Sequence, residues 1–139
     1  MGYGERYGMG TILIVDDDKM VVDMERLMLQ LQGYAVVAET DPVRALERFR
    51  SQPDFFDLVI TDLEMPSMSG IDFSRKLKAV LPAIPIILLT GSCDARRKEN
   101  ALSMGIVVVG KPLERRALCQ AIEEILRNRG ATTAGETSG

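Results

Sequence analysis

Five short apolar runs, separated by longer segments with helical spacing, constrain the fold of this chain more than any other feature. The runs are Thr11–Val15, Tyr34–Ala38, Leu58–Thr61, Pro85–Leu89 and Ile106–Val109. Such short, nearly continuous apolar runs are typical of strands buried on both faces of a parallel sheet. Five repeats of strand followed by helix predict an α/β fold, a doubly wound parallel sheet with right-handed crossovers and helices on both faces.

The segments between the runs carry helix signals. The apolar residues of the first segment recur at intervals of three and four: Met20, Val21, Met24, Leu27, Met28 and Leu31, with Gly33 following as a stop. Further helices are expected at Val43–Arg50, Ile71–Leu81, Asp94–Met104 and from about Leu113 to Arg127. We expect the stripe of the first helix to face the core.

The length of 139 residues fits one domain, with 46% hydrophobic and 27% charged residues, as in ordinary globular proteins. We assign this domain to residues 11–129 and expect a flexible N-terminal segment at residues 1–10. Residues 130–139 are rich in Thr, Gly, Ala and Ser, which predicts a flexible tail or linker.

Charge and composition argue against several classes of function. With 17 basic and 20 acidic residues the net charge is −3, which disfavours direct nucleic-acid binding. The longest apolar stretch, Ile84–Leu89, contains Pro85 and is too short to cross a membrane. The N-terminus lacks the features of a secretory signal, and Cys93 and Cys119 are too far apart for a C-x-x-C motif. A cytoplasmic protein with free thiols is therefore expected.

Polar side chains follow four of the apolar runs at the point where each run ends. They are Asp16, Asp17 and Asp18 after the first run, Asp62 after the third, Thr90 after the fourth, and Lys111 after the fifth. The carboxyl ends of parallel strands meet at one edge of the sheet, so these side chains are expected to share a crevice.

Clustered carboxylates repel one another unless a cation neutralises them, and hard oxygen ligands favour Mg²⁺, or alternatively Mn²⁺. With such an ion in place, Asp62 can attack a phosphoryl donor as a carboxylate nucleophile. Lys111 and Thr90 would then bind the phosphoryl oxygens. Asp18 is either a metal ligand or the N-cap of the first helix, since Asp is favoured at N-caps.

Four ordered motifs carry a resemblance to a known family. They are Ile-Val-Asp16-Asp17, Thr61-Asp62-Leu-Glu-Met-Pro66 with Gly70, Leu-Leu-Thr90-Gly91, and Lys111-Pro112. From about Thr11 to Arg129 the chain resembles the response regulator receiver domains of two-component systems. The resemblance implies a flavodoxin-like fold with strand order 2-1-3-4-5.

The resemblance also implies roles for individual residues. Asp62 would be the phosphoacceptor, Asp17 would bind Mg²⁺ directly, and Asp16 would bind it largely through water. The backbone carbonyl of Glu64 would complete the protein ligands to the metal. Thr90 would move toward the phosphate to propagate the signal, and Lys111 would bind the phosphate. The peptide bond between Lys111 and Pro112 would be cis.

Two departures from the family pattern affect the expected mechanism. Val108 stands where the family usually has a Tyr or Phe that acts as a rotamer switch, so signalling is expected to depend mainly on Thr90 and the loop after it. Glu64 and Ser92 stand at the two positions that tune hydrolysis of the phosphoryl group in the family. We expect the Glu64 charge to alter the approach of the attacking water.

The implied function is phosphorelay signalling by a regulatory domain that assists only its own phosphorylation and dephosphorylation and is not otherwise an enzyme. The chain contains no His, so the phosphoryl donor must be another molecule. A histidine kinase or histidine phosphotransfer protein is the expected partner, with a downstream output domain or partner protein as a further possibility. The sequence leaves open whether the chain is a stand-alone regulator or part of a larger protein.

Two other readings of the same residues are weaker. In a phosphatase of the haloacid-dehalogenase type, Asp16 would be the nucleophile and Asp18 the general acid. That family needs a further acidic pair after the lysine, which the last helix matches poorly, and Asp62 would have no role. An unphosphorylated receiver-like interaction module is the other alternative, and the complete set of acids, threonine and lysine argues against it.

Overall fold

The computed structural model of the chain describes residues 10–91, 95–111 and 114–138. These residues form one parallel sheet of five strands in the order β2-β1-β3-β4-β5, the order that the resemblance implies. The strands are β1 (Thr11–Val15), β2 (Ala35–Glu39), β3 (Leu58–Asp62), β4 (Ile86–Thr90) and β5 (Val107–Gly110). The α/β, flavodoxin-like fold class is therefore confirmed.

Every strand except β1 reaches one residue further toward its carboxyl end than the apolar run that predicts it. Backbone pairing continues past the last apolar side chain, since Val15 pairs with Glu39, Asp62 with Leu89, and Thr90 with Gly110. A ladder hydrogen bond does not depend on the side chain of the residue that makes it. Asp62 and Thr90 consequently lie inside the rigid sheet.

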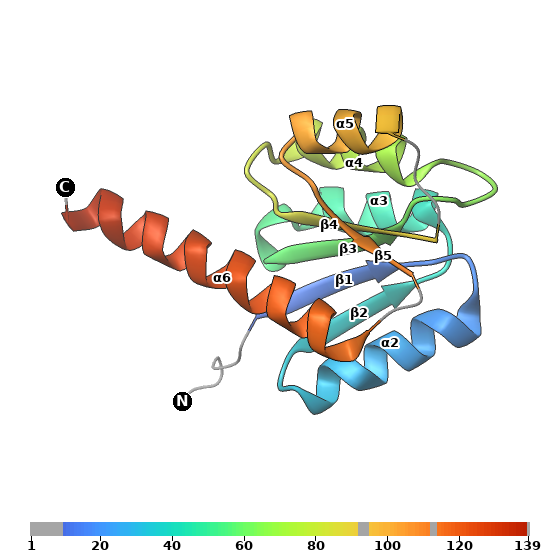
Figure 1. Cartoon of the computed structure of the whole chain (residues 1–139), viewed down its shortest axis with the longest axis horizontal. Helices are drawn as coiled ribbons and strands as arrows, with labels where there is room; N and C mark the ends of the chain where they lie inside the picture. Colours follow the sequence, from blue (N-terminus) through green and yellow to red (C-terminus); the bar gives the residue numbers. More distant parts are fainter. Residues whose placement is uncertain (1–9, 92–94, 112–113, 139) are drawn as a thin grey trace.

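The helices cover both faces of this sheet. They are α2 (Lys19–Leu31), α3 (Pro42–Ser51), the 3₁₀ turn η1 (Pro53–Phe55), α4 (Gly70–Val80), α5 (Ala95–Ser103) and α6 (Arg115–Ser138). Figure 1 shows α3, α4 and α5 on one side of the sheet and α2 and α6 on the other. Each side has its own apolar core, one built around Phe49 and Phe73 and the other around Ile12 and Leu29.

Side chains at the helix ends explain where several helices begin and end. The Asp18 carboxylate accepts hydrogen bonds from the backbone N–H groups of Met20 and Val21, so Asp18 is the N-cap of α2. Gly33, the expected stop signal, has a φ of 103°, a conformation that favours glycine just beyond a helix. Asp41 caps α3 in the same way, with Pro42 in the first turn.

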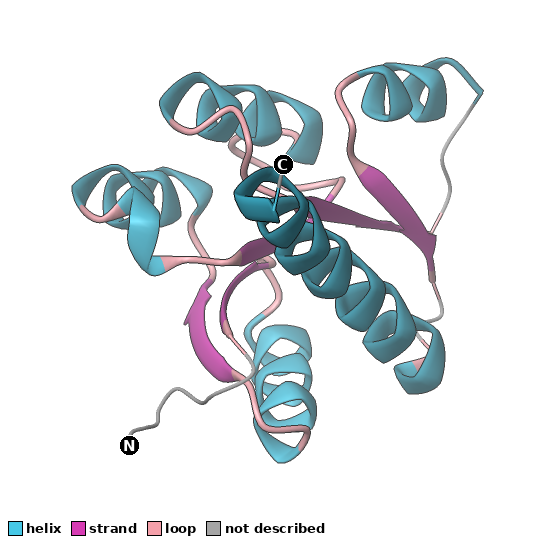
Figure 2. Ribbon diagram, turned by 90° about the vertical axis from the view of Figure 1, so that its left-hand side faces the viewer, coloured by secondary structure: helices cyan, strands magenta, loops and turns pink. Residues whose placement is uncertain are grey.

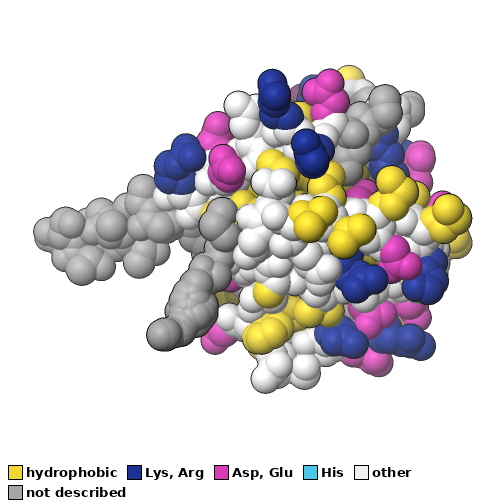
Figure 3. All heavy atoms as spheres, turned by 90° about the horizontal axis from the view of Figure 1, so that it is seen from below, with side chains coloured by type: hydrophobic (Ala, Val, Ile, Leu, Met, Phe, Trp, Pro, Cys, Tyr) yellow, Lys and Arg dark blue, Asp and Glu magenta, His cyan; other side chains and the backbone are white. Residues whose placement is uncertain are grey.

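The prediction that the apolar stripe of α2 faces the core is wrong for four of its six residues, since of the six only Met28 packs against the core and Val21 is half-buried. Met20, Met24, Leu27 and Leu31 are exposed, by 76%, 70%, 59% and 75% respectively. The buried side chains of α2 are instead Val22, Glu25 and Leu29. The helix packs on the sheet through Val22 and Leu29, which join Ile12 and Ile14 in one core, and this leaves the longer apolar stripe turned outward. Figure 3 views the molecule from the side on which α2 lies in Figure 1, and hydrophobic side chains form a band across this face with charged side chains beside it.

The last helix is longer than its apolar stripe predicts. The helical backbone continues past Arg127 to Ser138, and Figure 1 shows this end of α6 projecting away from the rest of the domain. Its terminal segment contains no proline, and an isolated glycine such as Gly130 costs a helix only about 1 kcal/mol. The end expected at Arg127 is therefore wrong, whereas flexibility of residues 130–139 stays a prediction, and residues 1–9 lie outside the described residues.

Figure 2 shows the strands in the middle of the molecule with helices around them, and every strand pair in the sheet is parallel. Over the described ranges, no helix combines the length and the apolar character needed to cross a lipid bilayer. All residues expected to form the site follow or end strands, so this architecture brings them to one edge of the sheet.

Candidate functional site

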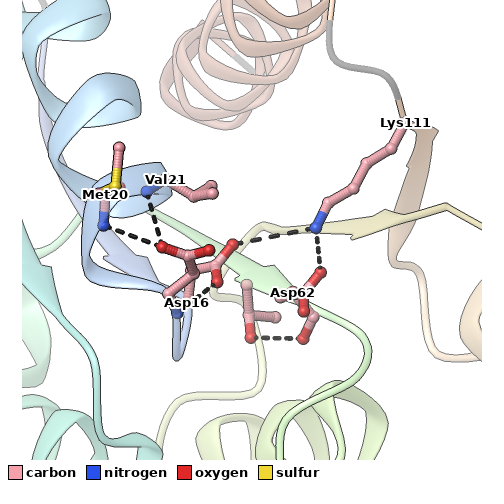
Figure 4. Close-up of polar contacts among 7 residues, drawn as sticks. Asp16, Met20, Val21, Asp62 and Lys111 are labelled. Carbon is pink, nitrogen blue, oxygen red and sulfur yellow. Dashed lines mark hydrogen bonds and ion pairs between the residues drawn. The ribbon is translucent and has the colours of Figure 1, made fainter.

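The central charged side chains of the site lie at the carboxyl ends of three strands. Asp16 directly follows β1, Asp62 is the last residue of β3, and Lys111 directly follows β5. The Lys111 Nζ atom lies 2.7 Å from Asp62 Oδ1 and 3.9 Å from Asp16 Oδ2. Figure 4 shows the lysine reaching across the crevice between these two carboxylates.

Both the side chain and the backbone of Lys111 are held by hydrogen bonds. Its backbone N–H donates a hydrogen bond of 2.7 Å to the Thr90 carbonyl oxygen, which anchors the start of the loop after β5 to β4. Burial alone would lower the pKa of Lys111, but the hydrogen bond and charge of Asp62, with the charges of Asp16 and Glu25, outweigh burial and raise this pKa. Lys111 is therefore a fixed positive charge at neutral pH.

Asp16 is a buried acid whose charge is only partly compensated. The residue is 3% exposed, and its Oδ1 atom accepts a hydrogen bond of 2.9 Å from the Asp18 backbone N–H. Its Oδ2 atom is buried and accepts no hydrogen bond from any described residue. Burial raises the pKa of Asp16, and the nearby charge of Asp62 adds to this effect. An added cation would relieve this cost.

The carboxylates of Asp16, Asp17 and Asp62 form a group that fits such a cation. Each offers an oxygen atom, and these atoms lie within 4.8 Å of one another. Asp16 and Asp62 are buried, whereas Asp17 is exposed, so the group opens to solvent on one side. Hard carboxylate oxygens with room for retained water are the donor set that Mg²⁺ prefers. Asp18, as the N-cap, points its carboxylate at the start of α2 instead.

Thr90 is the hydroxyl residue of the site, and it lies inside the sheet. It is the last residue of β4, only 5% exposed, and pairs with Gly110 at the end of β5. Val108, on the same strand as Gly110, is half-buried and packs against the core on the side of α3, α4 and α5. The short aliphatic side chain of Val108 thus occupies the place at which the family pattern leads one to expect an aromatic ring.

Gly70, part of the second motif, fixes how closely α4 approaches the end of β3. A Cβ atom at this position would overlap the Asp62 carbonyl oxygen and would lie 2.7 Å from Leu88 Cδ1 and 2.9 Å from Leu63 Cα. The Gly70 backbone N–H also donates a hydrogen bond of 2.7 Å to the Leu63 carbonyl oxygen. Only glycine permits this contact, which positions the backbone immediately after Asp62.

The Glu64 side chain pairs with Arg97, a residue of α5. Its Oε2 atom lies 3.6 Å from Arg97 Nη1, and both side chains are about half exposed or more. Both residues of this ion pair line a cleft of about 500 Å³, which is also lined by Asp17 and Met65. The cleft adjoins the group of three carboxylates through Asp17. Ser92 and Pro112, also named from the sequence, lie outside the described residues.

Two functional candidates escaped the sequence reasoning. Glu25 is a buried acid of α2. Burial is the main cause that raises its pKa, to about 7; the charges of Asp16 and Asp62 raise it further, and the charge of Lys111 lowers it. Its place between Val22 and Leu29, at helical spacing, was the signal for burial, but the stronger stripe of exposed residues concealed it. The Arg97–Glu64 ion pair joins segments far apart in the chain and gave no sequence signal.

Comparison with known proteins identifies one family. Residues 12–123 match the family described as response regulator receiver domain. Curated relatives include the putative two-component response regulator ARR21 of Arabidopsis thaliana, 32% identical over 86% of this chain and 19% of its own length. The probable transcriptional regulatory protein TcrX of Mycobacterium tuberculosis is 30% identical, with 88% of this chain and 52% of TcrX covered. The chain thus spans about half or less of these relatives.

Solved structures agree with this match in both fold and length. A response regulator receiver domain protein from Clostridium thermocellum superposes with a TM-score of 0.85 and 27% identity, covering 89% of this chain and 99% of the other. The chemotaxis protein CheY4 of Vibrio cholerae superposes with a TM-score of 0.77 and 27% identity, covering 84% and 98%. The similarity therefore extends over the whole of these domains.

Proposed function

Because the chain belongs to the response regulator receiver domain family and is a module of two-component phosphorelay signalling, we propose that Asp62 accepts the phosphoryl group. The observation that carries this proposal is the position of Asp62 between a fixed cation and two further acids. Asp62 is 8% exposed, is bonded to Lys111 at 2.7 Å and shares an oxygen cluster with Asp16 and Asp17. No other described aspartate combines these contacts.

In the proposed reaction a carboxylate oxygen of Asp62 attacks the phosphorus atom of a phosphodonor. A new P–O bond forms while the bond between phosphorus and the donor's leaving group breaks, and the product is an acyl phosphate. Lys111, already beside Asp62, balances the charge that the phosphoryl group adds. Thr90 at the end of the neighbouring strand then donates its hydroxyl hydrogen to a phosphoryl oxygen.

Asp16, Asp17, Asp62 and the backbone carbonyl of Glu64 are the proposed ligands of Mg²⁺, with Mn²⁺ as a substitute. The ion supplies charge neutralisation and orientation of the phosphoryl group. The Oδ2 atom of buried Asp16, which accepts no hydrogen bond from a described residue, and the close spacing of the three carboxylates support this assignment. The chain's own residues position the nucleophile and balance its charge, and we propose no enzymatic activity on other substrates.

The proposed donor is a histidine kinase or a histidine phosphotransfer protein, and the proposed recipient of the signal is an output domain or a separate partner protein. The chain itself has no His that could carry the phosphoryl group. The relatives named above are longer proteins, so this chain corresponds to one module of them. We further propose that Thr90, without an aromatic partner on β5, transmits phosphorylation to the loop leading into α5.

Labelling with a small phosphodonor tests the assignment of Asp62. Incubation with acetyl phosphate and Mg²⁺ should increase the intact mass by one phosphoryl group, and Asp62→Asn should abolish this increase because an amide cannot act as the nucleophile. Asp72→Asn is the matched control, since Asp72 is an exposed aspartate of α4 that pairs only locally with Arg75. Undiminished labelling of the Asp62→Asn protein would overturn the proposal. Absence of labelling in the unmodified protein would favour an inert interaction module.

A further inference from the structure

Thr61, the residue directly before Asp62, carries a hydroxyl group that is bonded to the backbone of its neighbour. The residue is 0% exposed, and its Oγ1 atom donates a hydrogen bond of 3.0 Å to the carbonyl oxygen of Asp62. Lys111 holds the carboxylate of Asp62, at 2.7 Å, and Thr61 holds its main chain. Side chain and backbone of the proposed phosphoacceptor are therefore fixed by two different residues.

The hydroxyl acts where the sheet supports the backbone of β3 on one side only. The pairing of β1 with β3 ends at Val15 opposite Thr61, whereas the pairing of β3 with β4 continues to Asp62 opposite Leu89. Asp62 thus lies one residue beyond the last pair that β1 makes with β3. A buried backbone carbonyl requires a hydrogen-bond donor, and at this point a side chain supplies one.

Two further hydrogen bonds hold the chain immediately after Asp62. The peptide unit between Asp62 and Leu63 is held at its carbonyl oxygen by Thr61, and its N–H group donates a bond of 2.9 Å to the Leu89 carbonyl oxygen. The next peptide unit is held at the Leu63 carbonyl oxygen, which accepts a bond of 2.7 Å from the Gly70 N–H. Two successive peptide units therefore have fixed orientations.

Of these three hydrogen bonds, only the one from Thr61 comes from a side chain. The other two are made by backbone N–H groups, which every residue except proline retains. A substitution at Thr61 can therefore remove one support and leave the other two in place. The carbonyl group of Glu64, a proposed ligand of Mg²⁺, follows directly after the two fixed peptide units.

We propose that Thr61 is a positioning residue for the metal site, because its hydroxyl fixes the backbone that leads from Asp62 to the Glu64 carbonyl. This inference rests on the metal ligands of the proposed function. Mg²⁺ demands near-ideal octahedral geometry, with ligands at about 2.0–2.1 Å, so a small shift of one ligand weakens binding. Thr61 acts in this way without contacting the ion.

A purely structural role of Thr61 leads to a different expectation. Loss of the buried hydrogen bond would then lower the free energy of unfolding but leave the metal affinity of the folded protein unchanged. Thr61→Val keeps the shape of the side chain and removes the hydroxyl, whereas Thr61→Ser keeps the hydroxyl. The two variants therefore separate the effect of the hydrogen bond from that of the side-chain shape.

Calorimetric titration of the full chain with Mg²⁺ tests the proposal. Thr61→Val should raise the Kd for Mg²⁺ by roughly 3–10-fold, as expected for one lost hydrogen bond, and Thr61→Ser should leave it within about twofold. Thr61→Ala, which also lacks the hydroxyl, should raise the Kd as Thr61→Val does. Thr11→Val is the matched control, since it makes the same change at the first residue of β1, at the far end of the strand from the site. An unchanged Kd in the two variants without a hydroxyl would overturn the proposal.

The dependence of labelling on Mg²⁺ gives a second readout. With acetyl phosphate at low Mg²⁺ the Thr61→Val protein should label more slowly than the unmodified protein, and at saturating Mg²⁺ the two rates should converge. A rate that stays low at saturating Mg²⁺ would overturn a role through the metal site. An unmodified protein that binds no Mg²⁺ would overturn the proposed metal ligands as well, whereas an unchanged Kd in the Thr61 variants overturns this inference alone.

Discussion

Glu25 is an acidic residue in a buried environment that disfavours its charged form. It is 6% exposed, its Oε1 atom has no hydrogen-bond partner within the described part of the chain, and burial and the charge of Asp16 raise its pKa to about 7. A buried carboxylate without a partner is costly, so the folded protein favours the protonated form. Neutral pH therefore lies close to the titration of this side chain.

We predict that Glu25 makes the fold less stable as pH rises from about 4.5 to about 7. In this interval the unfolded carboxyl has lost its proton while the folded one retains it, so the folded state binds more protons and loses stability with increasing pH. Glu25→Gln should remove this dependence and raise the free energy of unfolding above pH 7 by up to about 3 kcal/mol.

Urea denaturation at pH 5 and pH 8, with EDTA present to remove metal ions, measures this effect. The Glu25→Gln protein should match the unmodified protein closely at pH 5 and exceed it at pH 8. Glu99→Gln on α5, an exposed glutamate, serves as the control and should show no such difference. Equal gains of the Glu25→Gln protein at both pH values would contradict the prediction.

At the scale of elements, the approach of α4 to the end of β3 depends on Gly70. We predict that Gly70→Ala destabilises the domain by about 1–3 kcal/mol or more, because the added methyl group meets backbone atoms that cannot move aside. Urea denaturation gives the change, and Gly91→Ala is the control, since among the described residues a Cβ there meets only Lys111 Cβ, at an ordinary 3.9 Å. Equal stability of the two variants would argue against the close contact.

The Glu64–Arg97 ion pair links the loop after β3 to α5 across the cleft beside Asp62. We predict that Glu64→Ala changes the lifetime of the phosphorylated protein, because the pair limits how water approaches the phosphoryl group. Exposed ion pairs contribute up to about 1 kcal/mol, so a change of no more than about fivefold is expected.

Loss of phosphoryl label after removal of the donor measures this lifetime. Arg97→Ala should shift it in the same direction as Glu64→Ala, and the double variant should add little, because either change breaks the pair. Lys98→Ala, an exposed cation on the same helix, is the control. An unchanged lifetime in the Glu64→Ala protein would rule out its role.

At the scale of the whole molecule, the sheet was predictable because its strands are apolar on both faces. Residues such as Ile12, Ile14, Leu88 and Leu89 can be buried only between two layers of helices, and alternation with helical segments leaves few topologies. The strand order itself came from the resemblance carried by the four motifs. The ends of the apolar runs pointed to Asp16, Asp17, Asp62, Thr90 and Lys111, and the resemblance gave these residues their roles. The sheet brings Asp16, Asp62, Thr90 and Lys111 to the ends of adjacent strands.

The face of α2 that packs on the sheet and the length of α6 could not be predicted in this way. Helical periodicity identifies an apolar stripe but not which of two faces meets the sheet, and α2 presents both Val22 with Leu29 and the exposed stripe from Met20 to Leu31. Residues beyond Arg127 carry no apolar stripe, so their helical backbone left no trace in the pattern that identifies packed helices.

The order of residues along the chain therefore determined the helices and strands, the acids at the strand ends and the chemistry that these acids allow. Such features depend on neighbours in sequence, through side-chain period, capping and strand termini. The burial of Glu25, the reach of Lys111 to Asp62, the ion pair of Glu64 with Arg97 and the outward stripe of α2 depend on neighbours in space. Those contacts exist only after packing selects one face of each helix, because burial is a property of the assembled layers and not of any single segment.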